Sequence, residues 1–151
     1  MTLETIYYED FLDTGVIESD ESHKMERDAI VSFAQEWDPR PFHLSEEGAR
    51  DTLLGGLCAS GVHTLAVALK LLNTTSYYQL SVVCGLSIDN FCLHKPVYVD
   101  DELKIRIRLV DHRESKSRPQ CGILNIHVDI LNQHEDIVSS LDNIILVNKR
   151  P

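Results

Sequence analysis

The sequence predicts an α+β domain in which a long antiparallel sheet wraps around one central helix. Two observations lead to this fold class. Residues 60–72 are apolar around nearly the whole circumference of a helix, so that helix must be buried on most sides. After Asn73 the chain changes to long segments with strand-like alternation, joined by short polar turns. One buried helix followed by four strands packs best when the sheet curls around the helix, and a flat α+β sandwich is the alternative.

The length and charge of the chain restrict its domain count and the kinds of partner that it can bind. A chain of 151 residues fits a single domain over residues 1–151, and an apolar content of 43% is enough for an ordinary core. The formal net charge of -10 repels phosphate backbones, so we expect no nucleic-acid partner. An anionic small ligand would need a local basic patch.

The cysteines and the first residues indicate the compartment. The four cysteines form no Cys-x-x-Cys pair, and residues 1–10 lack the basic and apolar regions of a signal peptide. We therefore expect free thiols and a cytoplasmic location. The apolar stretch at residues 53–72 contains Gly55, Gly56 and Lys70, which favours a loop and a buried helix over a membrane span. The histidines lack metal-ligand spacing, so we expect no metal and no cofactor.

The first half of the chain predicts short helices. Residues 18–24 are polar and predict a loop, and apolar residues then recur at helical spacing over residues 26–37. Asp38 ends this helix because the residue before a proline is pushed out of the α region. Ser45 is the predicted N-cap of a short helix that runs to Arg50.

The second half predicts a turn, one long helix and four strands. The chain must turn at Gly55 and Gly56, and the helix over residues 60–72 is about 20 Å long, enough to cross a small sheet. Strict alternation from Lys104 to Leu109 gives one wet and one dry face. An antiparallel sheet that curls around such a helix is the hotdog architecture. The strand candidates are residues 80–93, 97–110, 123–130 and 137–147, with polar turns at 111–120 and 132–136.

One proline-rich segment is the best candidate for chemistry. Its two prolines predict a rigid, extended turn that holds Asp38 and His43 in a fixed relation, as general acid–base catalysis requires. Histidine transfers protons near neutral pH, and a carboxylate can orient it or share its water. On spacing alone a structural interpretation is favoured, with Asp38 at a helix end and His43 hydrogen-bonded in a turn. The segment reads Trp37-Asp38-Pro39-Arg40-Pro41-Phe42-His43.

This segment resembles the hallmark of the MaoC-type dehydratases, relatives of the (R)-specific enoyl-CoA hydratases. The hallmark is an Asp, a polar residue, Pro, an apolar residue and His, here Asp38, Arg40, Pro41, Phe42 and His43. The likeness extends over almost the whole chain. Residues 8–11 resemble the opening strand of the family, 55–61 the glycine-rich entry to its helix, 95–103 a strand–turn–strand signature, and 115–119 with Gly122 a turn of one branch.

The resemblance implies a hotdog fold and an enoyl-CoA hydratase-type lyase of fatty acid metabolism. Asp38 and His43 would be catalytic: they would hold and deprotonate the water that attacks C3 of a trans-2-enoyl thioester, and return a proton at C2. Backbone amides near Ser60 and Gly61, at the start of the helix, would bind the substrate carbonyl as it becomes enolate-like. Alternatively, Gly61 is a glycine required by packing between helix and sheet.

Two residues depart from the family pattern. Arg40 stands where Asn or Gln is common, and because it cannot accept hydrogen bonds it either points outward or binds a substrate carboxylate or phosphate. Ala66 stands where the (R)-specific hydratases carry a serine early in the helix.

Other polar residues are weaker candidates. Arg113, Lys116 and Arg118 form the densest basic cluster and could bind the phosphates of coenzyme A, although a solvated hairpin tip is the simpler interpretation. His63 and Thr64 lie on the apolar helix, where we expect them to be satisfied by a backbone group or to face a partner subunit.

Two other functions stay open, since a fold does not fix a function: an acyl-CoA thioesterase, and a non-catalytic protein that binds acyl thioesters. We also expect a homodimer or a dimer of dimers, because pairing two sheets side by side covers an exposed sheet edge. The resemblance implies that the acyl pocket lies at the subunit interface.

Overall fold

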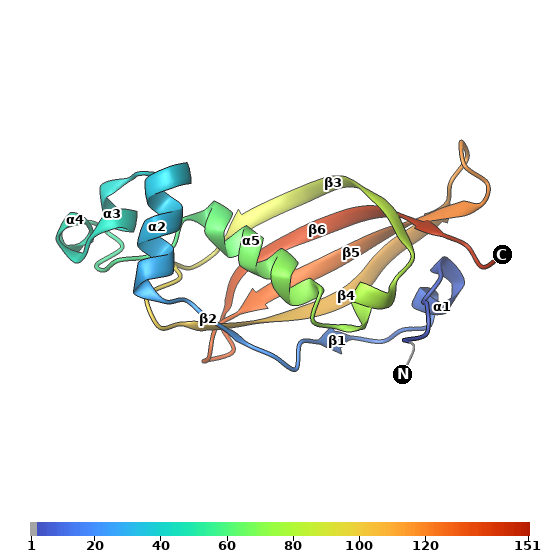
Figure 1. Ribbon diagram of the computed structural model, residues 1–151, viewed down its shortest axis with the longest axis horizontal. Helices are drawn as coiled ribbons and strands as arrows, with labels where there is room; N and C mark the ends of the chain where they lie inside the picture. Colours follow the sequence, from blue (N-terminus) through green and yellow to red (C-terminus); the bar gives the residue numbers. More distant parts are fainter. Residues whose placement is uncertain (1–2) are drawn as a thin grey trace.

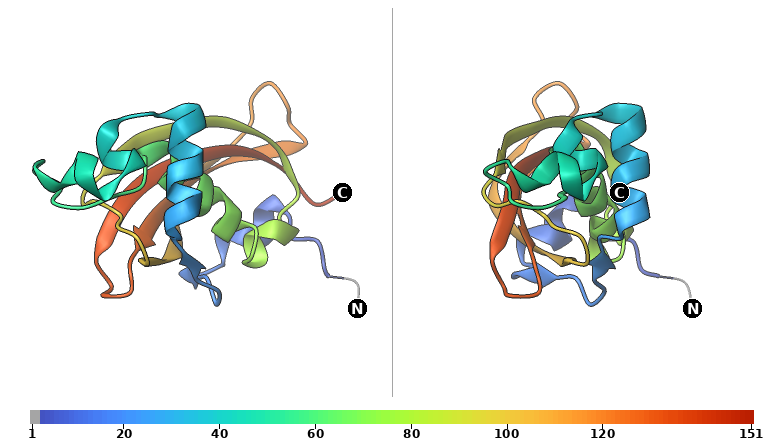
Figure 2. Two further views of the ribbon diagram at one scale, coloured as in Figure 1. Left: turned by 60° about the vertical axis from the view of Figure 1, so that its left-hand side comes forward. Right: turned by 90° about the vertical axis from the view of Figure 1, so that its left-hand side faces the viewer.

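The computed structural model describes residues 3–151, and its main feature is an antiparallel sheet curled around one long helix (Figure 1). The strands lie in the order β1 (Ile17–Glu18), β4 (Glu102–Glu114), β5 (Cys121–Leu131), β6 (Ile137–Asn148) and β3 (Val82–Leu93), and neighbouring strands are antiparallel. The helix α5 (Gly61–Leu72) lies against the concave face of the sheet (Figure 2). The predicted hotdog architecture is confirmed. The long strands are β3 (Val82–Leu93), β4 (Glu102–Glu114), β5 (Cys121–Leu131) and β6 (Ile137–Asn148).

Two short strands extend the sheet beside β4. β1 (Ile17–Glu18) and β2 (His23–Lys24) both pair antiparallel with β4. The prediction of a loop over residues 18–24 is therefore wrong at both ends of that segment. Polar side chains do not prevent pairing at a sheet edge, because the hydrogen bonds are made by backbone groups while side chains can remain in solvent.

The chain begins with a helix where the family likeness suggested a strand. α1 comprises Tyr8–Leu12. Asp10 in its first turn caps the helix start, because its Oδ2 accepts a hydrogen bond from the Tyr7 amide at 2.9 Å. Tyr8 and Phe11 bury their side chains on one face. The strand expected over residues 8–11 is wrong, because the acidic residue stabilises a helix start and the two aromatic residues recur at helical spacing.

β4 begins and ends later than the alternation predicts. Residues 97–101 form a turn in which the Asp101 carboxylate accepts a hydrogen bond from the Tyr98 amide at 2.8 Å. Asp100, within that turn, has a φ of 69°. Pairing of β4 with β5 then continues to Glu114. The hairpin turn is therefore shorter than the predicted turn over residues 111–120.

The core lies between α5 and the sheet, and burial alternates along the central strands as predicted. The α5 side chains of the core are those of Val67, Ala68, Leu71 and Leu72, and those of β5 are Leu124, Ile126, Val128 and Ile130.

No helix among residues 3–151 is both long and apolar enough to cross a membrane.

One side of α5 is not covered, while the rest of the helix is buried as expected. Val62 and Leu69 are exposed there, and the neighbouring edge strand β3 exposes Val82, Leu86 and Leu93. We call these five side chains the apolar edge. Apolar surface that remains uncovered beside the unpaired edge of a strand is typical of a protein–protein contact.

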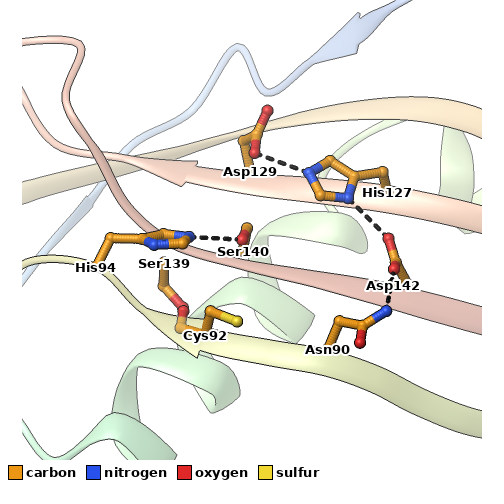
Figure 3. Close-up of polar contacts among 8 residues, drawn as sticks. All are labelled: Asn90, Cys92, His94, His127, Asp129, Ser139, Ser140 and Asp142. Atoms are coloured by element: carbon orange, nitrogen blue, oxygen red, sulfur yellow. Dashed lines mark hydrogen bonds and ion pairs between the residues drawn. The ribbon is translucent and has the colours of Figure 1, made fainter.

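A polar network joins three strands on the face of the sheet opposite α5 (Figure 3). His127 on β5 lies between two carboxylates, with Nδ1 2.7 Å from Asp142 Oδ1 and Nε2 3.0 Å from Asp129 Oδ1. Asn90 on β3 donates to Asp142 Oδ2 at 2.9 Å. The hydrogen bonds from Asn90 and His127 lower the pKa of Asp142 below its ordinary value. Asp142, on β6, therefore links both neighbouring strands.

We predict that Asp142→Asn lowers the melting temperature at neutral pH. Because folding lowers the pKa of Asp142, its contribution is complete above the unfolded-state pKa of about 3.9 and is lost as the pH falls through the folded-state value. The difference in melting temperature from wild type should therefore shrink in acid. Thermal unfolding followed by circular dichroism at several pH values measures it, with the exposed Asp51→Asn as control. A difference that stays constant down to acid pH would contradict this role.

Candidate active site

Asp38 lies at the end of α2 (Arg27–Trp37), in a group of short helices beside the start of α5 (Figure 1). Its backbone angles, φ -156° and ψ 70°, are not helical, as expected for the residue before Pro39. The Asp38 amide still bonds to the Ala34 carbonyl at 2.9 Å. The carboxylate is thus attached to a fixed helix end.

His43 lies on α3 (Pro41–Leu44), a single helical turn, so the predicted extended turn is wrong for this part of the segment. Pro41 is the first residue of that turn, where its missing N–H costs nothing. α4 (Glu46–Arg50) follows, and Ser45 caps it as predicted, accepting from the Gly48 amide at 2.9 Å. The prolines still fix the segment, since one ends α2 and the other starts α3.

The His43 ring is buried and held in one orientation. Its Nδ1 lies 2.7 Å from the carbonyl oxygen of Cys58. A carbonyl can only accept a hydrogen bond, so Nδ1 carries the proton and Nε2 of the neutral ring has a free lone pair. Nε2 lies 3.5 Å from Asp38 Oδ2. This distance is too long for a strong direct bond but allows one water to contact both groups.

Asp38 is held from its other side by Ser60. The Ser60 hydroxyl donates to Asp38 Oδ2 at 2.8 Å, and the same hydroxyl oxygen accepts from the Val62 amide at 3.3 Å. Ser60 is the N-cap of α5. The carboxylate is therefore joined to the positive end of the central helix through one hydroxyl.

Asp38 and His43 open into a pocket of about 350 Å³ between α3, the start of α5 and the end of β3. Its walls are mainly apolar, so an acyl chain would fit while the polar pair contacts one part of it. Lys95 and His94 add polar groups from the segment after β3. The other lining residues are Phe42, Leu54, Cys58, Ala59, Gly61, Thr64, Leu93, Pro96, Val97 and Val138.

The Cys58 thiol is close to His43 but is not an activated nucleophile. Its Sγ lies 3.8 Å from His43 Nδ1, and burial raises the pKa of the thiol. Because Nδ1 donates to the Cys58 carbonyl, the ring has no base facing the thiol. The arrangement therefore disfavours covalent catalysis by this cysteine.

Gly61 lies on the pocket wall at the first turn of α5. A Cβ built at Gly61 would lie 2.5 Å from Cδ1 of Leu93. Leu93 is exposed, so its side chain could move aside, but it would have to move within the pocket. The close approach of Leu93 agrees with a packing requirement for glycine here, and contact of this backbone with a substrate stays a prediction.

The remaining predicted site residues are not brought to this pocket within one chain. Arg40 is exposed and does not line it. Arg113, Lys116 and Arg118 lie at the β4–β5 hairpin, at the opposite end of the sheet from α2, α3 and α4 (Figure 1). Ser60 lies behind Asp38 rather than on the pocket wall.

The structure separates the two polar residues on α5. Thr64 lines the pocket one turn after Gly61. His63 instead stacks on Phe33 with ring centroids 4.6 Å apart, and burial lowers its pKa. The three-residue spacing from Gly61 to Thr64 was the sequence signal that could have assigned Thr64 to this wall. Among residues 3–151, no group of three metal-ligating side chains is close enough to hold a metal ion.

Comparison with known proteins identifies the family. A family model described as "MaoC like domain" matches residues 14–129. The chain belongs to the MaoC-like domain family. Among curated proteins, the "Uncharacterized protein YdeM" of Bacillus subtilis (strain 168) is 34% identical over 121 residues, covering 80% of this chain and 84% of YdeM.

Solved structures agree with the MaoC-like assignment. The crystal structure of the MaoC-like dehydratase from Rhodospirillum rubrum is 37% identical with a TM-score of 0.86, covering 97% of this chain and 99% of that one. The unliganded R-hydratase PhaJ1 from Pseudomonas aeruginosa has a TM-score of 0.68 at 19% identity, covering 97% and 88%. At that identity the likeness to PhaJ1 shows the shared fold alone.

We predict that Cys58 resists alkylation in the folded MaoC-like domain. Burial and the raised pKa of its thiol keep it protonated and shielded, despite the neighbouring imidazole. Iodoacetamide labelling at mildly alkaline pH, with peptide mapping by mass spectrometry, measures this. The same thiol in urea-unfolded protein is the reference. Labelling of Cys58 at equal rates in the folded and unfolded protein would contradict the prediction.

Proposed function

We propose that this MaoC-like protein is a hydratase or dehydratase of trans-2-enoyl thioesters, with coenzyme A as the carrier. One observation carries the proposal: the free Nε2 of His43 and the carboxylate of Asp38 converge, 3.5 Å apart, on an apolar pocket. Membership of the MaoC-like domain family supports it. So does the 37% identity to the MaoC-like dehydratase from Rhodospirillum rubrum.

In the hydration direction, one water lies between the two catalytic groups. The neutral His43 ring accepts a proton at Nε2, because its Nδ1 is committed to the Cys58 carbonyl. Ionised Asp38 accepts the other hydrogen of the water and so orients its oxygen toward C3. The two groups thus provide the base and the orientation that attack on an alkene carbon requires.

The addition is completed by forming a C–O bond at C3 and a C–H bond at C2. The proton taken from water passes through the Asp38–His43 pair to C2, so both new bonds form on the same face of the alkene. One water is consumed and no other reactant is needed. Dehydration is the same sequence reversed.

The start of α5 suits the developing charge on the thioester carbonyl. Gly61 lies on the pocket wall at the helix N-terminus, where backbone N–H groups point outward and the helix dipole favours negative charge. An enolate-like oxygen bound there would be stabilised more strongly than the ground-state carbonyl. The absence of a side chain at Gly61 allows that close approach.

We further propose that the protein is a cytoplasmic homodimer paired through β3. The apolar edge would be covered by a second copy, with β3 of each subunit at the centre of a continuous sheet. A two-fold axis between the paired β3 strands makes the strands of the partner subunit run in the opposite direction. The β4–β5 hairpin of the partner subunit would then lie at the same end as the pocket, which offers a route for Arg113, Lys116 and Arg118 to reach the phosphates of coenzyme A.

The first prediction from this proposal concerns activity. Purified protein should remove the conjugated enoyl absorbance of crotonyl-CoA or a longer enoyl-CoA. Asp38→Asn and His43→Ala should each lower kcat/KM by at least about 100-fold, the usual effect of losing a general acid or base. The exposed Asp51→Asn and His134→Ala are matched controls that should behave as wild type.

Thiol release from saturated acyl-CoAs is followed in parallel. Hydration that is unaffected by either catalytic substitution would rule out this assignment of the site. Thiol release without hydration would replace the proposal with a thioesterase.

The second prediction concerns assembly. Wild type should sediment as a dimer in analytical ultracentrifugation, and Leu86→Glu should shift it toward monomer, since a carboxylate is costly to bury in an apolar contact. Leu53→Glu, which changes an exposed leucine in the loop before α5, is the control. A monomeric wild type, or an equally dimeric Leu86→Glu variant, would contradict pairing through the apolar edge.

A further inference from the structure

The resemblance to (R)-specific hydratases leaves one position of this chain unexplained. Those enzymes carry a serine early in the central helix, and the matching residue here is Ala66. Ala66 is exposed on α5 and does not line the pocket. A hydroxyl that contacts the catalytic carboxylate nevertheless exists in this structure, and it comes from Ser60, before the first turn of the helix.

The Ser60 side chain is completely buried, and its hydroxyl has both a hydrogen-bond acceptor and a hydrogen-bond donor as partners. Its single hydroxyl proton is donated to Asp38 Oδ2 at 2.8 Å. Its oxygen accepts from the Val62 amide, which fixes the direction of the hydroxyl. Because Ser60 is absent from the pocket wall, it cannot act by touching an acyl chain. Its one polar contact with the catalytic pair is the Asp38 carboxylate.

The Asp38 carboxylate needs such a contact. It follows the last residue of α2, and its side chain is 33% exposed, whereas that of His43 is 9% exposed. A carboxylate exposed to this extent can rotate, and the 3.5 Å separation from His43 Nε2 is too long to restrain it. The Ser60 hydroxyl is a charge-assisted donor to the same oxygen that faces His43.

We propose that Ser60 is a positioning residue of the hydration site, which holds Asp38 Oδ2 beside His43 Nε2 and so fixes where the reacting water binds. This inference rests on the proposed function, since it assigns Ser60 a part in that reaction. It replaces the substrate-binding part that the sequence assigned to Ser60.

A purely structural alternative is that Ser60 only caps α5. Kinetics separate the two, because a residue that positions the carboxylate acts on kcat, whereas a residue that binds the ground-state substrate acts on KM. A cap alone would change stability and leave both constants near wild type. Thr75→Ala is the matched control: Thr75 also caps a helical turn, accepting from the Tyr77 amide at 3.2 Å, and it is remote from the pocket.

The experiment measures kcat and KM for hydration of crotonyl-CoA by wild type, Ser60→Ala, Ser60→Thr and Thr75→Ala. Ser60→Ala should lower kcat by about tenfold to a hundredfold, the range expected for a hydrogen bond to an ionised group, with KM changed far less. Ser60→Thr keeps the hydroxyl and should recover most of kcat. In the Asp38→Ala variant, adding Ser60→Ala should lower the residual rate little further.

Several results would overturn the inference. These are a kcat for Ser60→Ala no lower than that of Thr75→Ala, a loss expressed mainly in KM, or an equal fractional loss with and without the Asp38 carboxylate. If the Thr variant does not fold, the comparison of the two Ala variants still decides. A wild type that hydrates no enoyl-CoA overturns the proposed function itself, whereas an active wild type with an unaffected Ser60→Ala overturns only the part of Ser60.

Discussion

The hydrogen bond between His43 Nδ1 and the Cys58 carbonyl is the contact on which the candidate site depends. It joins the short helix α3 to the segment that leads into α5, and the Cys58 amide returns a bond to the Phe42 carbonyl at 3.2 Å. The next residue, Ala59, bonds to the Val97 carbonyl at 2.8 Å, which attaches the same segment to the chain before β4. These bonds fix the orientation of the imidazole and determine which nitrogen faces Asp38. Without them, Asp38 and His43 would not be held in a fixed relation.

The hotdog architecture supplies the rest of the site by geometry. The curled sheet places the end of β3 beside the start of α5, so that Leu93 from β3 and Gly61 and Thr64 from α5 line the pocket onto which Asp38 and His43 open. The N-terminus of α5 also places the positive end of the helix dipole where an enolate oxygen would form. Ser60 connects the two, since it caps the helix and bonds to the carboxylate. Under the proposed function, the pocket, the helix N-terminus and the Asp38–His43 pair would therefore act together where these elements converge.

The sequence predicted the strand-rich second half and the central helix because their apolar periodicity directly reflects burial. It could not place α1 or the short edge strands, since these depend on partners distant in the chain: Tyr8 packs on Gly122, and β1 and β2 pair with β4. The proximity of Asp38 and His43 followed from the proline spacing. The contact of Ser60 with Asp38 could not be predicted, because this hydrogen bond spans 22 residues and no local sequence pattern indicates it. The basic hairpin was assigned by charge alone, and charge does not say at which end of a sheet a hairpin lies.

The most direct test is a crystal structure of the Asp38→Asn variant with crotonyl-CoA bound. We expect C3 of the crotonyl group to lie beside His43 Nε2 with one water between them, at the near-attack separation of about 3.5 Å from that water. It also predicts that the thioester oxygen points to the amides at the start of α5. A structure in which the thioester carbonyl carbon, rather than C3, faces the water beside His43 would contradict a hydratase and support hydrolysis of the thioester. An acyl group bound outside this pocket would contradict the site itself.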